Sequence, residues 1–377
     1  MIVFHAGDYA DPREGAAAYD PRAQLTALCA GARTVRFRMY VLTRDNVRIG
    51  SVPFREGRVD LDSEASIQRS VVCAIPGEFA QPVAFESHRL QPAMQLRMPD
   101  GGWCEWPLGV FLPTSPSRLQ TESGAVSYAV EGYDQAVVLR DDRLTSALTI
   151  PAGTGYLEAA YGQLQAAGVF RLVSDASDRA LTGDIQFEIG ARRLDIVNAL
   201  LTAINFRPVW FDAYGAARFT AYSPAFNRRA LHTYAAGGAS VVSPVVALDM
   251  DTFNIPNVIV ALVSREDGVL VSRWINEHPG SALSTVRRGR RVVEKVEVQD
   301  IADQETLDEY VKRLGNQTTA AGETVRFETL QMPLHGAWDM MHLDVGDAFG
   351  RYEETAWSLD MAPAGRMAHT ARKVVLV

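Results

Sequence analysis

The first third of the chain alternates apolar and polar residues with the period of a β-strand. Apolar side chains occupy every second position between residues 35 and 41, and the same spacing recurs at residues 126–130. Because successive side chains of a strand point to opposite faces, this spacing predicts strands with one face on a core and the other in water. Turn residues such as those at 99–102 separate the apolar segments. The pattern predicts a barrel or a sandwich of many short strands.

In residues 151–225 the apolar spacing becomes that of helices. One helix is expected between an N-cap at Thr154 and a terminating Gly168, since glycine readily adopts the left-handed conformation after a last turn. A second helix is expected at 194–204, where apolar residues recur at intervals of three and four. Residues 208–222 have the pattern of a β-hairpin. The middle of the chain is therefore predicted to be a small α+β unit.

The strand pattern returns from about residue 236. Strands are expected at 258–263, 292–298 and 325–327. One helix interrupts them, with Asp303 as its N-cap, an apolar stripe that continues to Leu314, and Gly315 as its end. The chain is thus predicted to place a β unit on each side of a smaller mixed unit.

Charge and cysteine content exclude several classes of protein. The 377 residues include 37 Lys and Arg against 45 Asp and Glu, a net charge of -8 that lacks the basic excess of free nucleic-acid binders. Cys29, Cys73 and Cys104 form no CxxC pair, so neither a disulfide framework nor a structural zinc site is expected. No segment has the composition of a membrane span, and the N-terminus lacks a signal-peptide pattern. We expect no membrane anchor and synthesis in a reducing cytoplasm.

The best metal-like spacing is that of His335, Asp339 and His342. On a helix these residues would share roughly one face and could offer zinc ligands, as in a metallohydrolase. Pro333 and Gly336 oppose a helix there, and no HExxH-type general base accompanies the histidines. We therefore expect hydrogen-bonded or exposed histidines, with no metal, no cofactor and no catalytic residue. The metallohydrolase remains an alternative.

The most basic feature of the sequence is a cluster of arginines, namely Arg287, Arg288, Arg290 and Arg291. Guanidinium groups suit both phosphates and protein interfaces. Because Glu294 follows closely and the whole chain is acidic, we expect an interface between subunits, or ion pairs within the chain, rather than contact with nucleic acid.

A carbohydrate- or receptor-binding module is a second alternative. Trp103, Trp106 and Trp338 could offer stacking surfaces to a sugar. In a β-rich chain with 6 tryptophans, however, such side chains more often fill cores. Binding of the protein to cells, or its absence, distinguishes the two interpretations.

A series of segments, in their order along the chain, resembles the tail hub proteins of long-tailed bacteriophages. The resemblance covers about residues 125–377, while the N-terminal third is similar in pattern only. No segment is catalytic. The segments are 132–144 (GYDQAVVLRDDRL), 150–156 (IPAGTGY), 189–215 (IGARRLDIVNALLTAINFRPVWFDAYG), 255–264 (IPNVIVALVS), 284–293 (STVRRGRRVV), 300–314 (DIADQETLDEYVKRL), 332–340 (MPLHGAWDM) and 352–374 (YEETAWSLDMAPAGRMAHTARKV).

This resemblance implies a definite architecture. Hub proteins of this family are homotrimers whose chains each contain two β-barrel domains related to the tail-tube subunit, so that a three-fold ring fits a six-fold tube. The first barrel would comprise residues 1–150, and the small α+β domain residues 151–235, joined by the helix at 303–314. The second barrel would comprise residues 236–377, discontinuous around that helix. The expected fold class is α+β and β-rich, with two tail-tube-like β-barrel domains plus a smaller α+β domain.

The resemblance also implies a mechanical function without catalysis. Such a hub closes the distal end of the tail tube, at the tail tip or baseplate, beside the distal tail protein or the last tail-tube ring. It receives the tape measure protein, holds a downstream tail-tip or fibre protein, and lets DNA pass on ejection. An acidic chain is compatible with a lumen that holds DNA weakly. The expected location is the virion tail, after synthesis in the host cytoplasm, and a contractile tail or an injection particle fits equally well.

Overall fold

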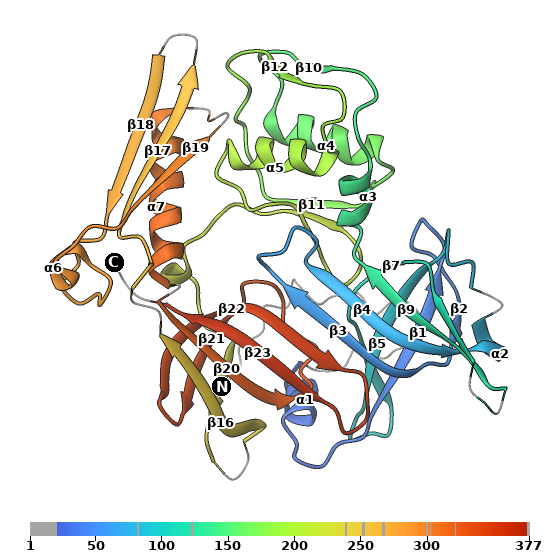
Figure 1. Ribbon diagram of the computed structural model, residues 1–377. Helices are drawn as coiled ribbons and strands as arrows, with labels where there is room; N and C mark the ends of the chain where they lie inside the picture. Colours follow the sequence, from blue (N-terminus) through green and yellow to red (C-terminus); the bar gives the residue numbers. More distant parts are fainter. Residues whose placement is uncertain are drawn as a thin grey trace.

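The computed structural model describes residues 21–80, 83–120, 122, 124–237, 240–250, 253–265, 268–298, 301, 303–320 and 322–374. Residues 1–20 and 375–377 of the two expected barrels lie outside this description. The described chain is β-rich, and its largest sheet has 11 strands (Figure 1). Within this part of the chain, no helix combines the length and the apolar character needed to cross a membrane.

The 11-stranded sheet joins segments from both ends of the sequence. Its order is β16-β20-β23-β22-β3-β4-β9-β7, with β8 also paired to β9, and with β21 and β15 attached through β22. At the central seam β3 and β22 pair antiparallel, with Asp60 opposite Ser358. The bounds are β3 (Arg55–Asp62), β4 (Arg69–Pro76), β7 (Leu112–Pro113), β8 (Ser117–Gln120), β9 (Val126–Tyr133), β15 (His232–Ala235), β16 (Val242–Met250), β20 (Glu323–Leu330), β21 (Met340–Val345), β22 (Ala348–Asp360) and β23 (Arg366–Lys373).

Two closed barrels are expected from the sequence, but no sheet of the described residues closes on itself. A barrel requires its first and last strands to pair. Here β22 pairs with β3 instead, so the two predicted β units are halves of one open sheet. The main path of the sheet ends at β16 on one side and at β7 and β8 on the other, and the branch through β21 ends at β15.

A second sheet covers the N-terminal half of the large sheet. Its order is β2-β1-β5-β6, with bounds β1 (Val35–Leu42), β2 (Arg48–Val52), β5 (Arg89–Arg97) and β6 (Trp103–Pro107). Helices α1 (Pro21–Leu28) and α2 (Gly77–Ala80) contact β5 and β9, respectively. The two sheets share an apolar core in which Met39, Val71 and Met94 are fully buried. The alternation of apolar and polar residues at 35–41 therefore marks the side chains of β1 that face the core between the two packed sheets.

The middle of the chain forms the predicted α+β unit around its own apolar core. Both expected helices and the expected hairpin are present, although the N-cap of the first helix is Gly155 rather than Thr154. Gly168 has a φ of 82°, as a terminating glycine requires. The elements are α3 (Ala136–Asp141), β10 (Leu148–Ile150), α4 (Tyr156–Ala166), β11 (Leu172–Ser174), β12 (Ile185–Phe187), α5 (Arg193–Thr202), β13 (Trp210–Phe211), β14 (Ala217–Phe219) and the 3-10 helix η1 (Ala225–Asn227).

Between β16 and β20 the chain leaves the large sheet and forms a separate layer. Strands β17 (Val258–Arg265), β18 (Gly268–Ile275) and β19 (Val293–Val298) make a three-stranded sheet, and α7 (Gln304–Ala320) packs on it, with α6 (Thr285–Arg288) before β19 (Figure 1). Asp303 caps α7, as predicted, by accepting a hydrogen bond of 2.7 Å from the Thr306 backbone N–H. On its other side α7 contacts the middle unit, where Arg313 donates to the Phe206 carbonyl at 3.1 Å.

The prediction that Gly315 ends this helix is wrong, because α7 continues to Ala320. A β-carbon at Gly315 would lie 2.2 Å from the ring of Trp274 on β18. The glycine therefore permits close packing of the helix on the sheet, and it does not terminate the helix.

Candidate functional site

The large sheet contains the same arrangement of four strands twice. The first array consists of β3, β4, β9 and the segment β7–β8, and the second array consists of β16, β20, β23 and β22. In each array the first two strands in sequence pair, the last strand pairs with the second, and the third strand lies outermost. All of these pairings are antiparallel. At the seam, the outermost strand of the second array pairs with the first strand of the first array.

The same order leaves a strand with one free edge at each end of this path of strands, within the part of the chain that is described. Strand β16 lies at one end and β7 at the other (Figure 1). Free edges offer unpaired backbone N–H and C=O groups to another strand. Each edge also exposes an apolar side chain, Leu119 on β8 with 57% exposed and Val245 on β16 with 75% exposed. The two ends are therefore complementary, in the same sense as the two strands of the seam.

The face of the large sheet opposite its cores carries paired charges. On β3, for example, Val59 and Leu61 are buried, whereas Arg58 and Asp60 alternate with them and point to the other side. The arginines of this face contact acids in four pairs, Arg58 with Asp60 at 3.0 Å, Arg326 with Asp249 at 2.7 Å, Arg366 with Glu328 at 3.2 Å and Arg372 with Glu64 at 2.6 Å. We call this surface the outward face. Its four paired arginines leave little positive charge uncompensated.

Buried polar side chains form a network behind the second array. Glu354 on β22 is fully buried and faces two imidazoles, those of His335 and His369. His369 Nδ1 lies 2.5 Å from the carboxylate, and His335 Nδ1 donates to its other oxygen. The far nitrogens face hydroxyl groups, with His335 Nε2 at 2.7 Å from Tyr234 Oη and His369 Nε2 at 2.8 Å from Thr329 Oγ1.

Thr329 connects the network to the backbone. Its hydroxyl donates to the Leu330 carbonyl at 2.7 Å and lies 2.8 Å from His369 Nε2, while His369 Nδ1 donates to Glu354. Both nitrogens of this buried ring therefore have a hydrogen-bond partner.

His335 completes the network. Its Nδ1 donates to Glu354, and its Nε2 hydrogen-bonds to the Tyr234 hydroxyl. Burial by itself would raise the pKa of Glu354, but the charges and hydrogen bonds of the two histidines outweigh burial and lower that pKa to about 2. Glu354 is therefore ionised at neutral pH.

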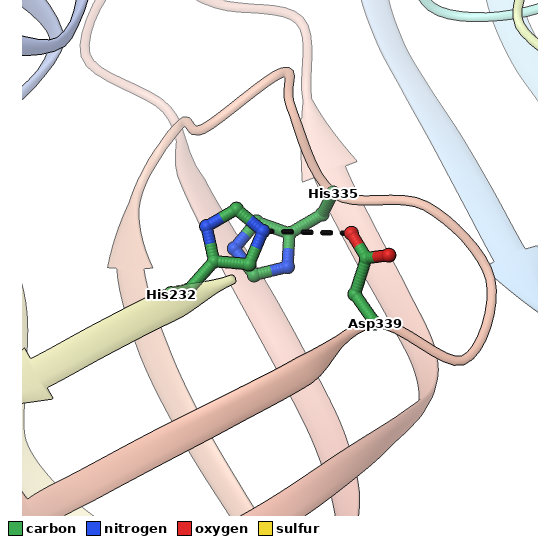
Figure 2. Close-up of side chains that lie close together, drawn as sticks. All are labelled: His232, His335 and Asp339. Atoms are coloured by element: carbon green, nitrogen blue, oxygen red, sulfur yellow. Dashed lines mark hydrogen bonds and ion pairs between the residues drawn. The ribbon is translucent and has the colours of Figure 1, made fainter. Parts of the chain in front are cut away.

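His232 on β15 stacks on His335, with ring centroids 3.9 Å apart (Figure 2). Its Nε2 lies 3.4 Å from Asp339 Oδ2, which also accepts from the Gly336 backbone N–H at 2.7 Å. Its Nδ1 is buried and has no hydrogen-bond partner among the described residues. Burial, and after it the neighbouring His335, lowers the pKa of His232 against the opposing effect of Asp339. The ring is accordingly neutral at pH 7.

The structure brings together His335 and Asp339 of the predicted metal-like trio, but not His342. Residue 342 lies on β21, where its ring packs edge-on against Phe349 at 5.5 Å. No helix aligns the three side chains, because residues 331–339 form a loop before β21. The helical alignment that Pro333 and Gly336 oppose in the sequence is absent, and His232 from a distant strand takes the third position.

Two groups of side chains lie close enough to hold a metal ion, namely His232 with His335 and Asp339, and His335 with Glu354 and His369. In the second group both Nδ1 atoms already donate to the carboxylate. In the first group the two rings stack at an interplanar angle of 18°, and Asp339 lies beside His232 Nε2. The contacts of both groups are those of a hydrogen-bonded network.

The predicted arginine cluster lies at one end of the inserted layer. Arg288 and Arg290 both donate to the Phe253 carbonyl, and the guanidinium of Arg290 lies 4.2 Å from the centre of the Phe253 ring. Arg287 and Arg291 are exposed. Two of the arginines thus bind the segment after β16 to the inserted layer, and an interface between subunits stays a prediction for the cluster.

The three tryptophans of the carbohydrate-binding alternative contact side chains of the chain itself. Trp106 is buried in the core between the two sheets. Trp103 has the guanidinium of Arg36 at 3.7 Å from its ring centre. Trp338 packs edge-on against Trp210 at 5.9 Å. This geometry agrees with the structural interpretation.

Sequence analysis did not single out four members of the network, His232, Tyr234, Glu354 and His369. A signal existed for His369, which lies between the buried Met367 and Ala371 in the alternation of β23. A titratable side chain at a core position of a strand indicates a buried polar network, because such a group must find partners. Spacing along one segment cannot identify partners that come from different strands.

A search of solved structures finds proteins that share this fold. A tail protein from Neisseria meningitidis MC58 has a TM-score of 0.64 and 13% identity, covering 90% of this chain and 97% of that one. The 43 kDa tail protein of prophage MuSo2 from Shewanella oneidensis has a TM-score of 0.61 and 10% identity, covering 90% and 98%. The prophage tail protein gp18 from Listeria monocytogenes EGD-e has a TM-score of 0.54 and 11% identity, covering 89% and 94%.

No protein-family model matches the chain, and a search of curated proteins finds no match. The structural similarity extends over nearly the whole of both chains in each comparison. The chain therefore has the fold of phage and prophage tail proteins, and the resemblance to tail hub proteins is confirmed at the level of fold.

Proposed function

We propose that this chain is a structural tail hub protein of a phage or a phage-derived particle, with three copies in a ring. The observation that carries the proposal is the repeat of one strand order within the 11-stranded sheet, with complementary free edges at its ends. Each copy contributes two arrays, so three copies would build a wall of six similar units. Such a three-fold ring matches a six-fold tail tube.

The seam between β22 and β3 is the template for the contact between copies. On this template, β8 of one copy takes the place of β22, and β16 of the next copy takes the place of β3. Leu119 and Val245 would then be neighbours across the new strand pair, where apolar side chains favour pairing. A head-to-tail contact of this kind generates a closed ring when its rotation is suitable.

The outward face would line the lumen of the ring. DNA carries dense negative charge and is retained by unpaired lysines and arginines. The four arginines of this face are each paired with an acid, which favours passage of DNA over binding. On this face, acids of the chain neutralise the arginines that would otherwise bind DNA.

The proposal assigns a role to each domain. Residues 1–150 and 236–377 supply the two tail-tube-like domains, whose strands join in the open sheet, and residues 151–235 with α7 supply the small domain. The ring would close the distal end of the tail tube against the distal tail protein or the last tail-tube ring. It would receive the tape measure protein and hold a downstream tail-tip or fibre protein. This role in the virion tail needs no catalytic residue and no cofactor.

Assembly of the purified chain tests the proposal. Mass photometry at increasing protein concentration is expected to detect trimers, and averaged electron micrographs of the trimers are expected to show a ring. Antibody labelling of tails is expected to place the chain on the central axis at the distal tip. A chain that lies off this axis would contradict the proposal.

The edges can be tested by a charge swap. Leu119→Lys and Val245→Lys are each expected to reduce the trimer fraction, because a charge replaces an apolar neighbour across the strand pair. Leu119→Lys combined with Val245→Glu is expected to restore it. Val269→Lys is the matched control, since Val269 on β18 is 59% exposed and lies on neither edge. Equal loss of trimers in the control would show that the edges are not the contact.

A further inference from the structure

Residues 331–339, which connect β20 to β21, lie across several parts of the molecule, and we call them the strap. Met332 and Leu334 of the strap are buried in the core between the two sheets of the N-terminal half. Gln331 donates to the Ala362 carbonyl at 2.7 Å, in the turn between β22 and β23, and accepts from Arg33 at 3.1 Å. This end of the strap therefore binds to the first array and to the seam.

The other end of the strap binds the buried network and the middle unit. His335 hydrogen-bonds to Tyr234 and Glu354, and it stacks on His232. The Trp338 carbonyl accepts from Arg228 at 2.5 Å, and the Trp338 backbone has a φ of 60°, which is unfavourable for this residue. One short segment thus holds three units together, and its central contact is a stack of two imidazoles.

We infer that the strap is a proton-sensitive latch, which stays closed while His232 is neutral and opens when His232 takes up a proton in mild acid. Opening would remove His335 and Asp339 from one side of the His232 ring and give its Nδ1 access to water. The latch acts within one chain, so the inference stands whether or not the chain forms a ring.

The geometry explains why the closed strap rejects this proton. A proton on His232 Nδ1 would create a buried N–H without an acceptor, since that atom has no partner among the described residues. It would also place a cation 3.9 Å from the centre of the His335 ring. The charge of Asp339 near Nε2 partly offsets both effects, at 3.4 Å. The other titratable and charged groups around this site are Tyr234 of the same strand, Glu354 of β22, His369 of β23, and Arg33 and Cys29 near Tyr234.

Beyond the partial effect of Asp339, Glu354 offers little compensation for this proton. Both of its oxygens already accept from His335 and His369. In the opened strap, by contrast, His232 is hydrated and regains the ordinary affinity of a histidine for protons. Mild acid therefore favours the open form, and each pH unit below the ordinary histidine pKa favours it by up to about tenfold.

Hydrogen–deuterium exchange of the whole chain tests the latch. Exchange is measured at about pH 7.5 and about pH 5.5, with correction for the intrinsic pH dependence, and protection of the strap is expected to fall about tenfold in acid. Protection of β4 and β9 in the first array is expected to stay unchanged. Wild-type protein with a strap that is equally protected at both pH values would overturn the inference.

Two substitutions identify the responsible group. His232→Phe keeps a stacked ring that cannot be charged, and the response of the strap to acid is expected to disappear. His342→Phe, on β21 opposite Thr233 of β15 but outside the network, is the matched control and is expected to keep the full response. A full response in His232→Phe would assign the titration to another group and refute the latch.

If His232→Phe does not fold, the imidazole signals of the wild-type protein decide. The Cε1 signal of His232 is expected to keep its neutral shift in acid for as long as the strap remains protected. A His232 signal that titrates as in an exposed histidine, with the strap still protected, would refute the latch. Both readings use monomeric chain, so they are independent of ring assembly.

Discussion

The two arrays of the large sheet share a strand order but differ in what lies behind them. The first array is backed by the sheet β2-β1-β5-β6 and by a large apolar core. Only the short strands β15 and β21 and a smaller apolar cluster back the second array, and there the buried histidines and Glu354 occupy the remaining space. The same topology is thus stabilised by apolar packing on one side and by a polar network on the other.

A pair of buried carboxylates makes this difference measurable. Asp134, at the end of β9, accepts from the backbone N–H groups of Arg69 and Ala136, both at 2.9 Å, and burial raises its pKa to about 6 despite these donors. Glu354 is equally buried, but the two histidines lower its pKa to about 2. The two histidines hold Glu354 in its charged form, whereas for Asp134 the effect of burial outweighs the backbone donors and the nearby charge of Arg69.

The largest effect is expected from Glu354→Ala. Removal of the carboxylate leaves the Nδ1 atoms of His335 and His369 buried without their acceptor, which costs about 3–5 kcal/mol in the free energy of unfolding. Urea denaturation at neutral pH measures this loss. In the first array, Ile75→Ala opens an apolar cavity and is expected to cost about 2–5 kcal/mol.

Replacement of the network by leucines separates the effect of the lost buried charge from the effect of the lost side-chain volume. Glu354→Leu combined with His335→Leu and His369→Leu replaces the network by apolar side chains, and it is expected to recover most of the stability lost in Glu354→Ala. A triple variant as unstable as Glu354→Ala would show that the network does more than compensate its own charges. His342→Ala serves as a control outside the network.

The alternating strands, the two helices of the middle unit and the N-cap Asp303 could be predicted from the sequence because they follow from local patterns. The period of residues 35–41 fixes which side chains of β1 face a core, and Asp303 accepts its hydrogen bond three residues away. The seam between β3 and β22 could not be predicted, because nothing in either strand specifies a partner about 300 residues distant. The open sheet and its free edges therefore became apparent only in the structure.

The candidate site shows the same division between local and distant information. His335 and Asp339 attracted attention through their spacing, yet their partners His232 and Glu354 come from β15 and β22. Gly315 was interpreted as a helix end because that is the commonest local meaning of a glycine after an apolar stripe. Its actual role depends on Trp274, which lies on another element.

The pH dependence of stability is expected to have opposite signs for the two carboxylates. The folded-state pKa of Glu354 lies below its ordinary value of 4.5, so its contribution is complete above pH 4.5 and is lost as pH falls towards 2. The folded-state pKa of Asp134 lies above its ordinary value of 3.8, so its contribution is lost as pH rises from 3.8 to about 6. When complete, the contribution of either carboxylate to the free energy of unfolding amounts to about 3 kcal/mol.

Denaturation of Glu354→Gln and Asp134→Asn across the acid range separates the two effects. Glu354→Gln is expected to reduce the loss of unfolding free energy as pH falls. Asp134→Asn is expected to reduce the loss of unfolding free energy as pH rises. Only the slopes are compared, because each substitution also changes hydrogen bonds. Slopes equal to those of the wild-type protein in both variants would contradict this assignment.

A smaller effect is expected in the inserted layer, which the second array has between β16 and β20 and the first array lacks between β3 and β4. Gly315→Ala places a methyl group 2.2 Å from the Trp274 ring, and the required shift is expected to cost about 1–3 kcal/mol. Gly162→Ala in α4 is the control of opposite sign, because no atom lies within 4 Å of its β-carbon. Thermal denaturation is expected to show that Gly162→Ala gains about 0.5–1 kcal/mol in the free energy of unfolding. If Gly315→Ala and Gly162→Ala both destabilise the protein, the cause is the replacement of a helical glycine in general and not the contact with Trp274.

The smallest effect on stability is expected at the outward face. There the informative measurement is retention of DNA, because exposed ion pairs contribute little to folding. Glu328→Gln leaves Arg366 without its acid partner but costs less than about 1 kcal/mol, because the pair is exposed to water. Assembled rings of this variant are expected to retain short duplex DNA more strongly at low salt, since one cation now faces the lumen. Glu297→Gln frees Lys295 on β19 by the same change of charge, away from the outward face, and is expected to leave retention unchanged. Equal retention by the two variants would mean that DNA responds to total charge alone, and that the paired arginines of the large sheet do not line its path.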